Sequence, residues 1–169
     1  MPIRAIVFDL GNTLIEQIID SEKPLNQLTL KLLPGVKPTL QVLSQRYQIA
    51  LLTNTTQSTS KAVSSALRKL SIVGYFDFVL TSIDVGLKKP DPRLFHLIIR
   101  QLGVAPKNTI MVGNDRAEDI RPAAKLGMLT AYFTEKHDPN YLEPDFQFSS
   151  FVDLPHLIDE LEARHDGIS

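Results

Sequence analysis

The sequence contains no cysteine. This absence excludes disulfide bonds, thiol catalysis and zinc sites built from thiolates. An excess of charge of either sign is also missing, because 18 Lys and Arg face 19 Asp and Glu, giving a formal net charge of −1. A nucleic-acid-binding protein that works through a broad basic face is therefore not expected.

Long apolar runs are absent as well. There is no stretch of about 18 apolar residues, the length needed to cross a bilayer. The opening MPIRAIVFDL has too short an apolar run, and an internal acid, for a signal peptide. The 169 residues, 43% of them apolar, suffice for one domain with a substantial core. We therefore expect a single soluble, cytoplasmic domain over residues 1–169, with no membrane partner.

Five short apolar runs rich in β-branched residues have the length of strands. Each is bounded by polar or turn residues, and their continuous apolar character indicates strands buried on both faces. The runs are Ile3–Phe8, Ile49–Leu52, Phe76–Leu80, Thr109–Val112 and Leu129–Phe133.

Segments with helical periodicity alternate with these runs. Strands alternating with helices predict an α/β fold with a mainly parallel sheet. A further short helix, Leu25–Leu33, is expected between the first strand and the first of these helices. The periodic segments are Pro38–Arg46, Ser60–Leu70, Pro92–Leu102, Asp119–Leu126 and Leu154–Leu161.

Polar residues follow the predicted strands. In parallel sheets, ligands bind outside the carboxyl ends of the strands, so these loops are the candidate site. The loops are FDLGNT (8–13), TNT (53–55), KKPD (88–91) and GND (113–115), the last followed by Asp119. Their carboxylates, hydroxyls and lysines suit a phosphate group and a cation.

These four loops, in this order, resemble the signature motifs of the haloacid dehalogenase-like hydrolase superfamily. VFDLGNTL is similar to the first motif, IALLTN to the second, GLKKPDPRLF to the third and IMVGNDRAEDIRPAAKLGM to the fourth. The resemblance covers about residues 4–133. It implies a Rossmann-like three-layer sandwich for the predicted α/β fold.

The resemblance also implies a chemistry. Asp9 would attack a phosphoryl group and form a covalent aspartyl intermediate, and splitting one hard step into two easier ones is the advantage of covalent catalysis. Lys89 and Mg²⁺ would balance the charge of the transferring oxygens. Thr53 and Asn54 would bind the phosphate. The implied metal-binding group is Asp9, Gly11, Asn114, Asp115 and Asp119.

Two positions depart from the family's pattern. Phosphatases of this family carry a second acid two residues after the first, and Gly11 stands there. Loss of a general acid/base typically removes about 10²- to 10⁴-fold of rate. The fourth motif has Asn114 where an acid is usual, so Asp115 and Asp119 would have to supply the negative charge. The direct ligand among these three residues is left open.

The interval where many relatives carry a cap domain is short. Residues 15–34 have room for a small cap-position insert and not for a domain. An open site suits a large phosphorylated substrate, such as a phosphoprotein or polymer end, or closure by a second copy of the chain.

Three functions remain open from the sequence. The first is a Mg²⁺-dependent phosphatase. The second, motivated by Gly11 and Asn114, is a weakly active or non-catalytic domain that binds phosphate or a protein. The third is a 2-haloacid dehalogenase, because a halide leaves without a proton. The missing cap weighs against the third, since dehalogenases of the family take key substrate groups from the cap.

Overall fold

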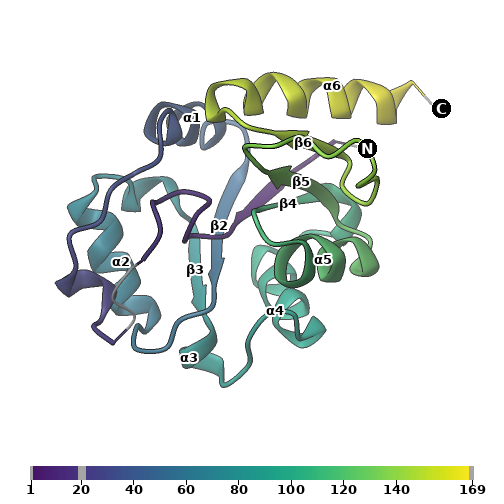
Figure 1. The fold of residues 1–169 in the computed structure, drawn as a ribbon. Helices are drawn as coiled ribbons and strands as arrows, with labels where there is room; N and C mark the ends of the chain where they lie inside the picture. The colour runs from purple at the N-terminus through teal and green to yellow at the C-terminus, as the bar shows by residue number, and fades with distance from the viewer. Residues whose placement is uncertain (1, 19–21, 168–169) are drawn as a thin grey trace.

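The computed structural model describes residues 2–18 and 22–167, which fold around a six-stranded sheet (Figure 1). The strands lie in the order β3-β2-β1-β4-β5-β6, and the paired strands are parallel throughout. The predicted α/β fold is thereby confirmed. The strand bounds are β1 Ala5–Phe8, β2 Gln48–Thr53, β3 Phe78–Thr81, β4 Thr109–Gly113, β5 Leu129–Phe133 and β6 Phe146–Phe148.

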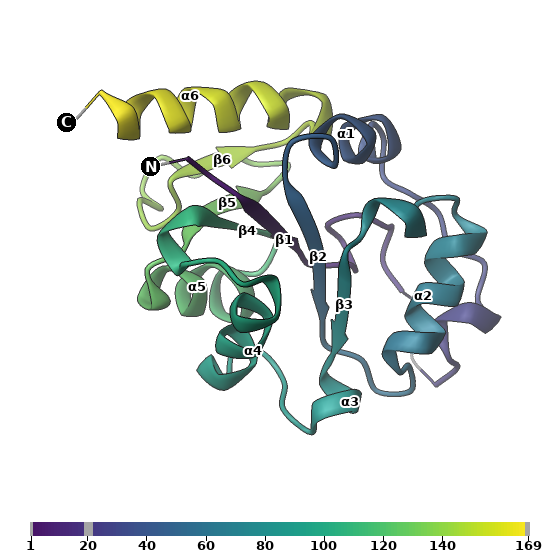
Figure 2. The ribbon, with the colours of Figure 1, turned by 180° about the vertical axis from the view of Figure 1, so that it is seen from behind.

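Helices cover both faces of this sheet and complete the three layers (Figures 1 and 2). On one face pack α1 Val36–Leu43, α2 Ser60–Lys69 and α6 Leu154–Asp166. On the other face pack α4 Pro92–Leu102 and α5 Arg121–Leu126. The remaining helical turns are short: α3 Ser82–Val85, η1 Leu25–Gln27, η2 Val73–Tyr75, η3 Pro106–Asn108, η4 Arg116–Ile120 and η5 Phe151–Asp153.

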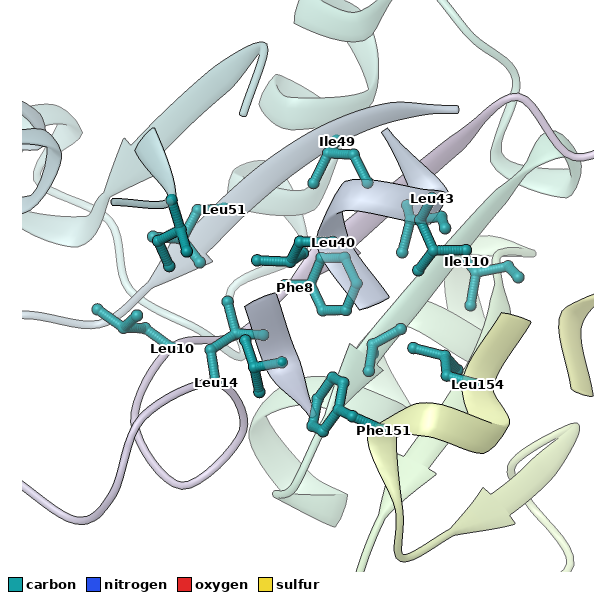
Figure 3. Close-up of a cluster of buried hydrophobic side chains, with 14 of the residues drawn as sticks. Phe8, Leu10, Leu14, Leu40, Leu43, Ile49, Leu51, Ile110, Phe151 and Leu154 are labelled. Carbon is teal, nitrogen blue, oxygen red and sulfur yellow. The ribbon is translucent and has the colours of Figure 1, made fainter. Parts of the chain in front are cut away.

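The central strand β1 shows why its sequence is apolar without interruption. Successive side chains point to opposite faces of a sheet. Ile6 and Phe8 join the cluster beneath α1, α2 and α6, which Figure 3 shows around Phe8. Ala5 and Val7 join the cluster beneath α4 and α5. All four residues are fully buried, so each position of β1 must be apolar.

The predicted helix Leu25–Leu33 is wrong beyond its first turn. Only Leu25–Gln27 is helical, as the 3₁₀ turn η1. Further on, the backbone pairs with the chain after β1: the Glu16 amide donates to the Lys31 carbonyl at 2.9 Å, and the Leu33 amide to the Leu14 carbonyl at 2.9 Å. Backbone groups used in this way are not available for a helix.

The predicted helix Asp119–Leu126 also differs from the structure. A π-helical turn, η4, precedes the α-helix α5, which begins at Arg121. The amides of Asp119 and Ile120 both donate to the Asp115 carbonyl, at 2.9 and 3.2 Å. The wider turn places Asp119 inside the protein, with 1% of its surface exposed. Single π-turns of this kind are frequent at functional sites.

Strand β6 was not predicted. It has three residues, and it extends the sheet by pairing with β5. Its Phe148 ring lies 5.2 Å from Phe133 and 5.5 Å from Phe151 between centroids. Aromatic packing of this kind stabilises a strand too short to show a periodic pattern in the sequence. Strands β1 and β3 begin two residues later than predicted.

The strand register gathers the polar loops at one edge of the sheet. Phe8 of β1 is level with Leu51 of β2 and with Val112 of β4. β1 ends there, so Asp9 is the first residue beyond it, while β2 continues to Thr53 and β4 to Gly113 before their loops begin at the same edge. Among the described residues, no helix has the length and apolar character to span a membrane.

Candidate active site

The centre of the site is a buried ammonium group between two carboxylates. The Lys89 Nζ donates to Asp9 Oδ1 at 2.8 Å and to Asp119 Oδ1 at 2.6 Å. Their side chains are 2%, 12% and 1% exposed for Lys89, Asp9 and Asp119. Asp9 is thus the member of the three that reaches solvent. The structure brings together three predicted site residues that are up to 110 positions apart in the sequence.

Burial and charge act against each other in this cluster. Burial opposes the charge on Lys89, but the two carboxylates outweigh it and raise the pKa of Lys89 above its ordinary value. Burial raises the pKa of Asp119 and the Asp9 charge adds to the rise, while Lys89 opposes it. The Lys89 ammonium, 2.6 and 2.8 Å from the two carboxylates, offsets the cost of burying their negative charge.

Gly113 permits the close approach of Asp119. A Cβ atom added at Gly113 would lie 2.4 Å from Asp119 Oδ2 and 2.5 Å from Asp119 Cβ. These distances are shorter than any real contact of a Cβ atom, so a larger residue at position 113 would displace Asp119. Asp119 Oδ2 also accepts from the Asp115 amide at 3.1 Å. The backbone of this loop therefore fixes the carboxylate on two sides.

Thr13 connects the Asp9 loop to the Asn114 loop. Its buried hydroxyl lies 3.1 Å from Asp9 Oδ2 and 3.2 Å from Asn114 Oδ1. A hydroxyl carries one hydrogen and donates to one acceptor at a time. The two acceptor oxygens thus share one donor. The sequence indicated Thr13 only as part of the turn after Asp9, and its contact with Asn114 depends on the fold.

Asn54 holds the backbone of Lys89. The Lys89 amide donates to Asn54 Oδ1 at 2.8 Å, and Asn54 Nδ2 donates to the Lys89 carbonyl at 3.0 Å. The Lys89–Pro90 peptide bond is cis. Both ends of the Asn54 side chain are therefore used to position Lys89. The predicted phosphate contact of Asn54 stays a prediction, and the contact of its side chain with Lys89 is a second role.

Thr53 is the last residue of β2 and is buried. Its Oγ1 lies 3.5 Å from the Asn54 carbonyl, which is a weak contact that a better acceptor could replace. Its position at the carboxyl end of the sheet agrees with the predicted phosphate-binding role, which stays a prediction.

Asp115 lies apart from the buried cluster. Its carboxylate is exposed and caps the turn η4, with Oδ1 accepting from the amides of Ala117 at 2.9 Å and Glu118 at 2.8 Å. An acid at the start of a helical turn satisfies amides that have no other partner. Within the predicted metal-binding group, the structure associates Asp9, Asn114 and Asp119 through Thr13 and Lys89, while the Asp115 carboxylate is directed to the cap.

The side-chain oxygens of Asp9 and Asn114 are the atoms of this site that suit Mg²⁺ as ligands. Within residues 2–18 and 22–167, no three His, Cys, Asp or Glu side chains gather in a way that could hold a metal ion. However, the Thr13 hydroxyl has one hydrogen for two acceptors, Asp9 Oδ2 and Asn114 Oδ1. One of these two oxygens is therefore left without a hydrogen bond from Thr13. Mg²⁺ typically binds one or two carboxylates and keeps waters and phosphate oxygens as its other ligands. The donors present fit that pattern, with the Gly11 carbonyl as a further predicted ligand.

Position 11 has space for a side chain. A Cβ atom added at Gly11 would meet only Ile18 Cδ1, at an ordinary contact distance of 3.6 Å. Steric crowding therefore does not require glycine at position 11. The effect of this glycine is that the first motif lacks a second acid.

The fold and this cluster define a Rossmann-like α/β protein with an aspartate–lysine–aspartate site at the carboxyl edge of its sheet. The sequence model of the haloacid dehalogenase-like hydrolase family matches residues 24–127. The chain belongs to this family.

Relatives of known activity are similar over most of this chain. A ribulose-1,5-bisphosphate 5-phosphatase of Halopiger xanaduensis is 30% identical over 141 residues, which are 83% of this chain and 58% of the relative. A glyceraldehyde 3-phosphate phosphatase of Pyrococcus furiosus is 32% identical over 142 residues, 80% of this chain and 57% of the relative. The chain thus spans less than two thirds of the length of these relatives.

Solved structures support the fold. A protein of Listeria monocytogenes serotype 4b, described as uncharacterized, aligns with a TM-score of 0.82 at 24% identity, covering 95% of this chain and 99% of the other. A HAD phosphatase from Thermococcus onnurineus aligns with a TM-score of 0.76 at 21% identity, covering 92% and 98%. At this level of identity the likeness concerns the fold alone.

Proposed function

We propose that this chain is a phosphatase that acts on phosphorylated small molecules through an aspartyl-phosphate intermediate on Asp9, with Mg²⁺ as cofactor. The observation that carries the proposal is the contact of Lys89 with Asp9 at 2.8 Å in a buried, partly open site. The phosphatase activities of the two relatives named above point to the same chemistry.

In the first step, an Asp9 carboxylate oxygen attacks phosphorus. A new O–P bond forms as the bond between phosphorus and the ester oxygen breaks, and the alcohol leaves with a proton taken from solvent. Lys89 is close enough to the attacking group to stabilise charge on the transferring oxygens. In the second step, water attacks phosphorus, the O–P bond to Asp9 breaks, and inorganic phosphate leaves.

Asp9 Oδ2, Asn114 Oδ1 and the Gly11 carbonyl are the residues that would hold Mg²⁺. When bound, the ion supplies positive charge that balances the phosphate oxygens and orients them. Asp119 contributes by fixing the Lys89 ammonium at 2.6 Å. Asp115 is the member of the predicted metal group whose side chain is used elsewhere, as the cap of η4.

The insert at residues 15–34 is proposed to be a minimal cap. Its described parts form the turn η1 and an isolated bridge between Ile15 and Leu32, and residues 19–21 lie outside the described structure. Closure of the site by a second copy of the chain, and the cytoplasmic location, stay predictions.

The test is a phosphatase assay with Mg²⁺ on aryl phosphates and sugar phosphates, comparing the wild type with Asp9→Asn. We expect Asp9→Asn to abolish measurable turnover, because an amide does not replace the carboxylate nucleophile. Asp153→Asn is the matched control, since Asp153 is exposed and makes no side-chain cap at α6. Turnover that survives in Asp9→Asn at the wild-type rate contradicts the assignment of Asp9.

A second candidate function is a domain that binds phosphate with little turnover. Gly11 favours it, because no acid stands at position 11 to protonate the leaving alcohol. The two candidates are separated by Gly11→Asp, for which the loop has room.

For Gly11→Asp we expect hydrolysis of alkyl phosphates to be about 10²-fold faster, which is the lower end of what a general acid/base contributes. Aryl phosphates need less protonation of the leaving group and should gain less. A wild type without turnover and a variant with it would favour the binding domain, whereas equal rates would show that position 11 does not limit turnover. Gly11→Asn, of the same shape but without a titrating proton, is the control.

A further inference from the structure

A cavity of about 600 Å³ adjoins the site on the side of β5 and β6. Two of its lining residues, Asn12 and Asn114, belong to the loops that carry Asp9 and Asp119. Asn114 is in contact with Thr13, which in turn contacts Asp9. One lining residue is therefore joined to the nucleophile through a single hydroxyl, and the volume of the cavity is in the range of small-molecule sites.

The lining of this cavity is rich in neutral hydrogen-bonding groups. The hydroxyl-bearing residues Thr134, Ser149 and Ser150 and the amide-bearing residues Asn12 and Asn114 all line it. The Thr134 hydroxyl also donates to the Lys136 carbonyl and accepts from the Lys136 amide. Groups of this kind both donate and accept hydrogen bonds, which suits a ligand that carries several hydroxyls. Apolar surface is supplied by Leu33, Phe133 and Phe151 among others.

The charges of the lining cancel. Among the residues that the structure describes, its charged ones are Glu135 and Lys136, which are neighbours in the sequence. A second phosphate group bound here would meet a carboxylate beside the single ammonium. The lining therefore favours a ligand end that is uncharged, because burial of an anion needs a matched cation.

The walls of the cavity are held in place. The Arg116 guanidinium contacts two tyrosine rings, 4.0 Å from the Tyr141 centroid and 5.4 Å from that of Tyr132, and pairs with Asp138 at 2.9 Å. This residue follows Asp115 directly, so it ties the loop after β5 to the loop that carries Asn114. Rigid walls reduce the entropy lost on binding and favour selectivity.

On the other wall, Phe151 packs against Phe133, with ring centroids 5.1 Å apart, and against Phe148. Figure 3 shows the Phe151 ring inside the buried cluster, pointing toward Leu14. The Thr134 amide donates to the Phe148 carbonyl at 2.9 Å. The hydroxyl-bearing residues of the cavity thus follow directly after β5 and β6, whose aromatic rings are packed together.

We propose that this cavity binds the leaving group of the substrate, and that this group is an uncharged, hydroxylated small molecule, so that the substrate is a sugar or polyol phosphate with a single phosphate. The proposal rests on the phosphatase function proposed above, because it places the phosphate at Asp9 and Lys89. It assigns selectivity to the core domain, through Asn12, Thr134, Ser149 and Ser150, without a cap.

The test is a titration of isotope-labelled Asp9→Asn protein, in which turnover is prevented, followed by NMR of its backbone amides. Ribose 5-phosphate is expected to shift the amide resonances of Thr134, Ser149 and Ser150. Inorganic phosphate is expected to shift resonances near Lys89 and to leave those three in place. Ribulose 1,5-bisphosphate should bind no more tightly than ribose 5-phosphate.

Two substitutions then address the cavity itself. Ser149→Leu fills the cavity and removes a hydroxyl, so ribose 5-phosphate should bind about tenfold more weakly, as expected when a polar contact in a pocket is replaced by bulk. Ser150→Leu is a second variant with the same expected direction. Gln101→Leu places the same side chain on the exposed face of α4 and should leave binding unchanged.

The outcomes separate the two proposals. The cavity proposal is overturned by any of four results. The first two are that ribose 5-phosphate does not bind and that its shifts are confined to the phosphate site. The other two results are unchanged binding in both serine variants and tighter binding of the bisphosphate. Shifts at the cavity together with the expected serine effects support it even if the wild type hydrolyses no phosphate ester, a result that would instead overturn the phosphatase function.

Discussion

Asp9 and Asp119 contact the same ammonium group, but the two loops that carry them are built differently. Asp119 is 1% exposed, stands on a π-turn, and touches Gly113 so closely that no side chain fits there. The Asp9 side chain is 12% exposed, and the neighbouring Gly11 has free space around it. The Asp119 loop holds its carboxylate in one position, whereas the Asp9 loop leaves room for a substrate and for a larger side chain at position 11.

This contrast between the two loops predicts which substitutions the protein tolerates. Around Asp119, the backbone and packing leave no alternative position, so substitutions should act on stability. Around Asp9, the same kinds of substitution should act on chemistry. Three predictions test this division, taken from the largest expected loss of stability to the smallest.

The largest loss is expected for Lys89→Met. Methionine is of similar length but leaves two buried carboxylates without a cation, which should lower the free energy of unfolding by about 3–5 kcal/mol. Chemical denaturation measures the loss. Lys88→Met is the control, because Lys88 is exposed and adjacent. If both variants were equally stable, the buried ion pairs would not be what holds the two loops together.

Gly113→Ala should have an intermediate effect. The added methyl group overlaps Asp119, and overpacking of this kind costs about 1–3 kcal/mol. Gly74→Ala is a matched control, since nothing lies within 4 Å of a Cβ atom added there. Thermal unfolding of the two variants gives the difference. An unaffected Gly113→Ala would mean that the Asp119 loop shifts easily, contrary to the comparison above.

Asp115→Ala should show the smallest loss. It removes the cap of η4, and loss of such a cap costs about 1 kcal/mol. Asp115→Asn keeps a residue that caps equally well, so its stability should remain at the wild-type value. The Mg²⁺ concentration for half-maximal activity should also stay the same in Asp115→Asn, because the carboxylate is directed to the cap. A large rise in that concentration would place Asp115 among the metal ligands after all.

The sequence predicted the architecture because the strands are continuous apolar runs and the helices between them are periodic. It also predicted that Asp9, Lys89 and Asp119 belong to one site, because the carboxyl ends of parallel strands share an edge. The family resemblance supplied their roles. These roles, and those of Thr53 and Asn54 toward phosphate, stay predictions.

Other features depend on contacts that a sequence pattern does not contain. The helix Leu25–Leu33 was wrong because long-range backbone pairing with residues 14–16 replaces local helical bonds. Strand β6 has three residues, too few for a period. The sequence placed Asp115 and Asp119 in one group, and only the π-turn directs one carboxylate inward and the other to a cap. The signal for that difference was Gly113, whose lack of a side chain marks a close approach.

The two hydrogen bonds between Asn54 and Lys89 join positions 35 apart in the chain. Their consequence is genetic as much as structural. A substitution of Asn54 would remove the hydrogen bonds that position the Lys89 backbone, although it changes no charge. The two positions should therefore vary together among related sequences. An engineer who transplants the lysine loop into another scaffold would have to carry the asparagine with it.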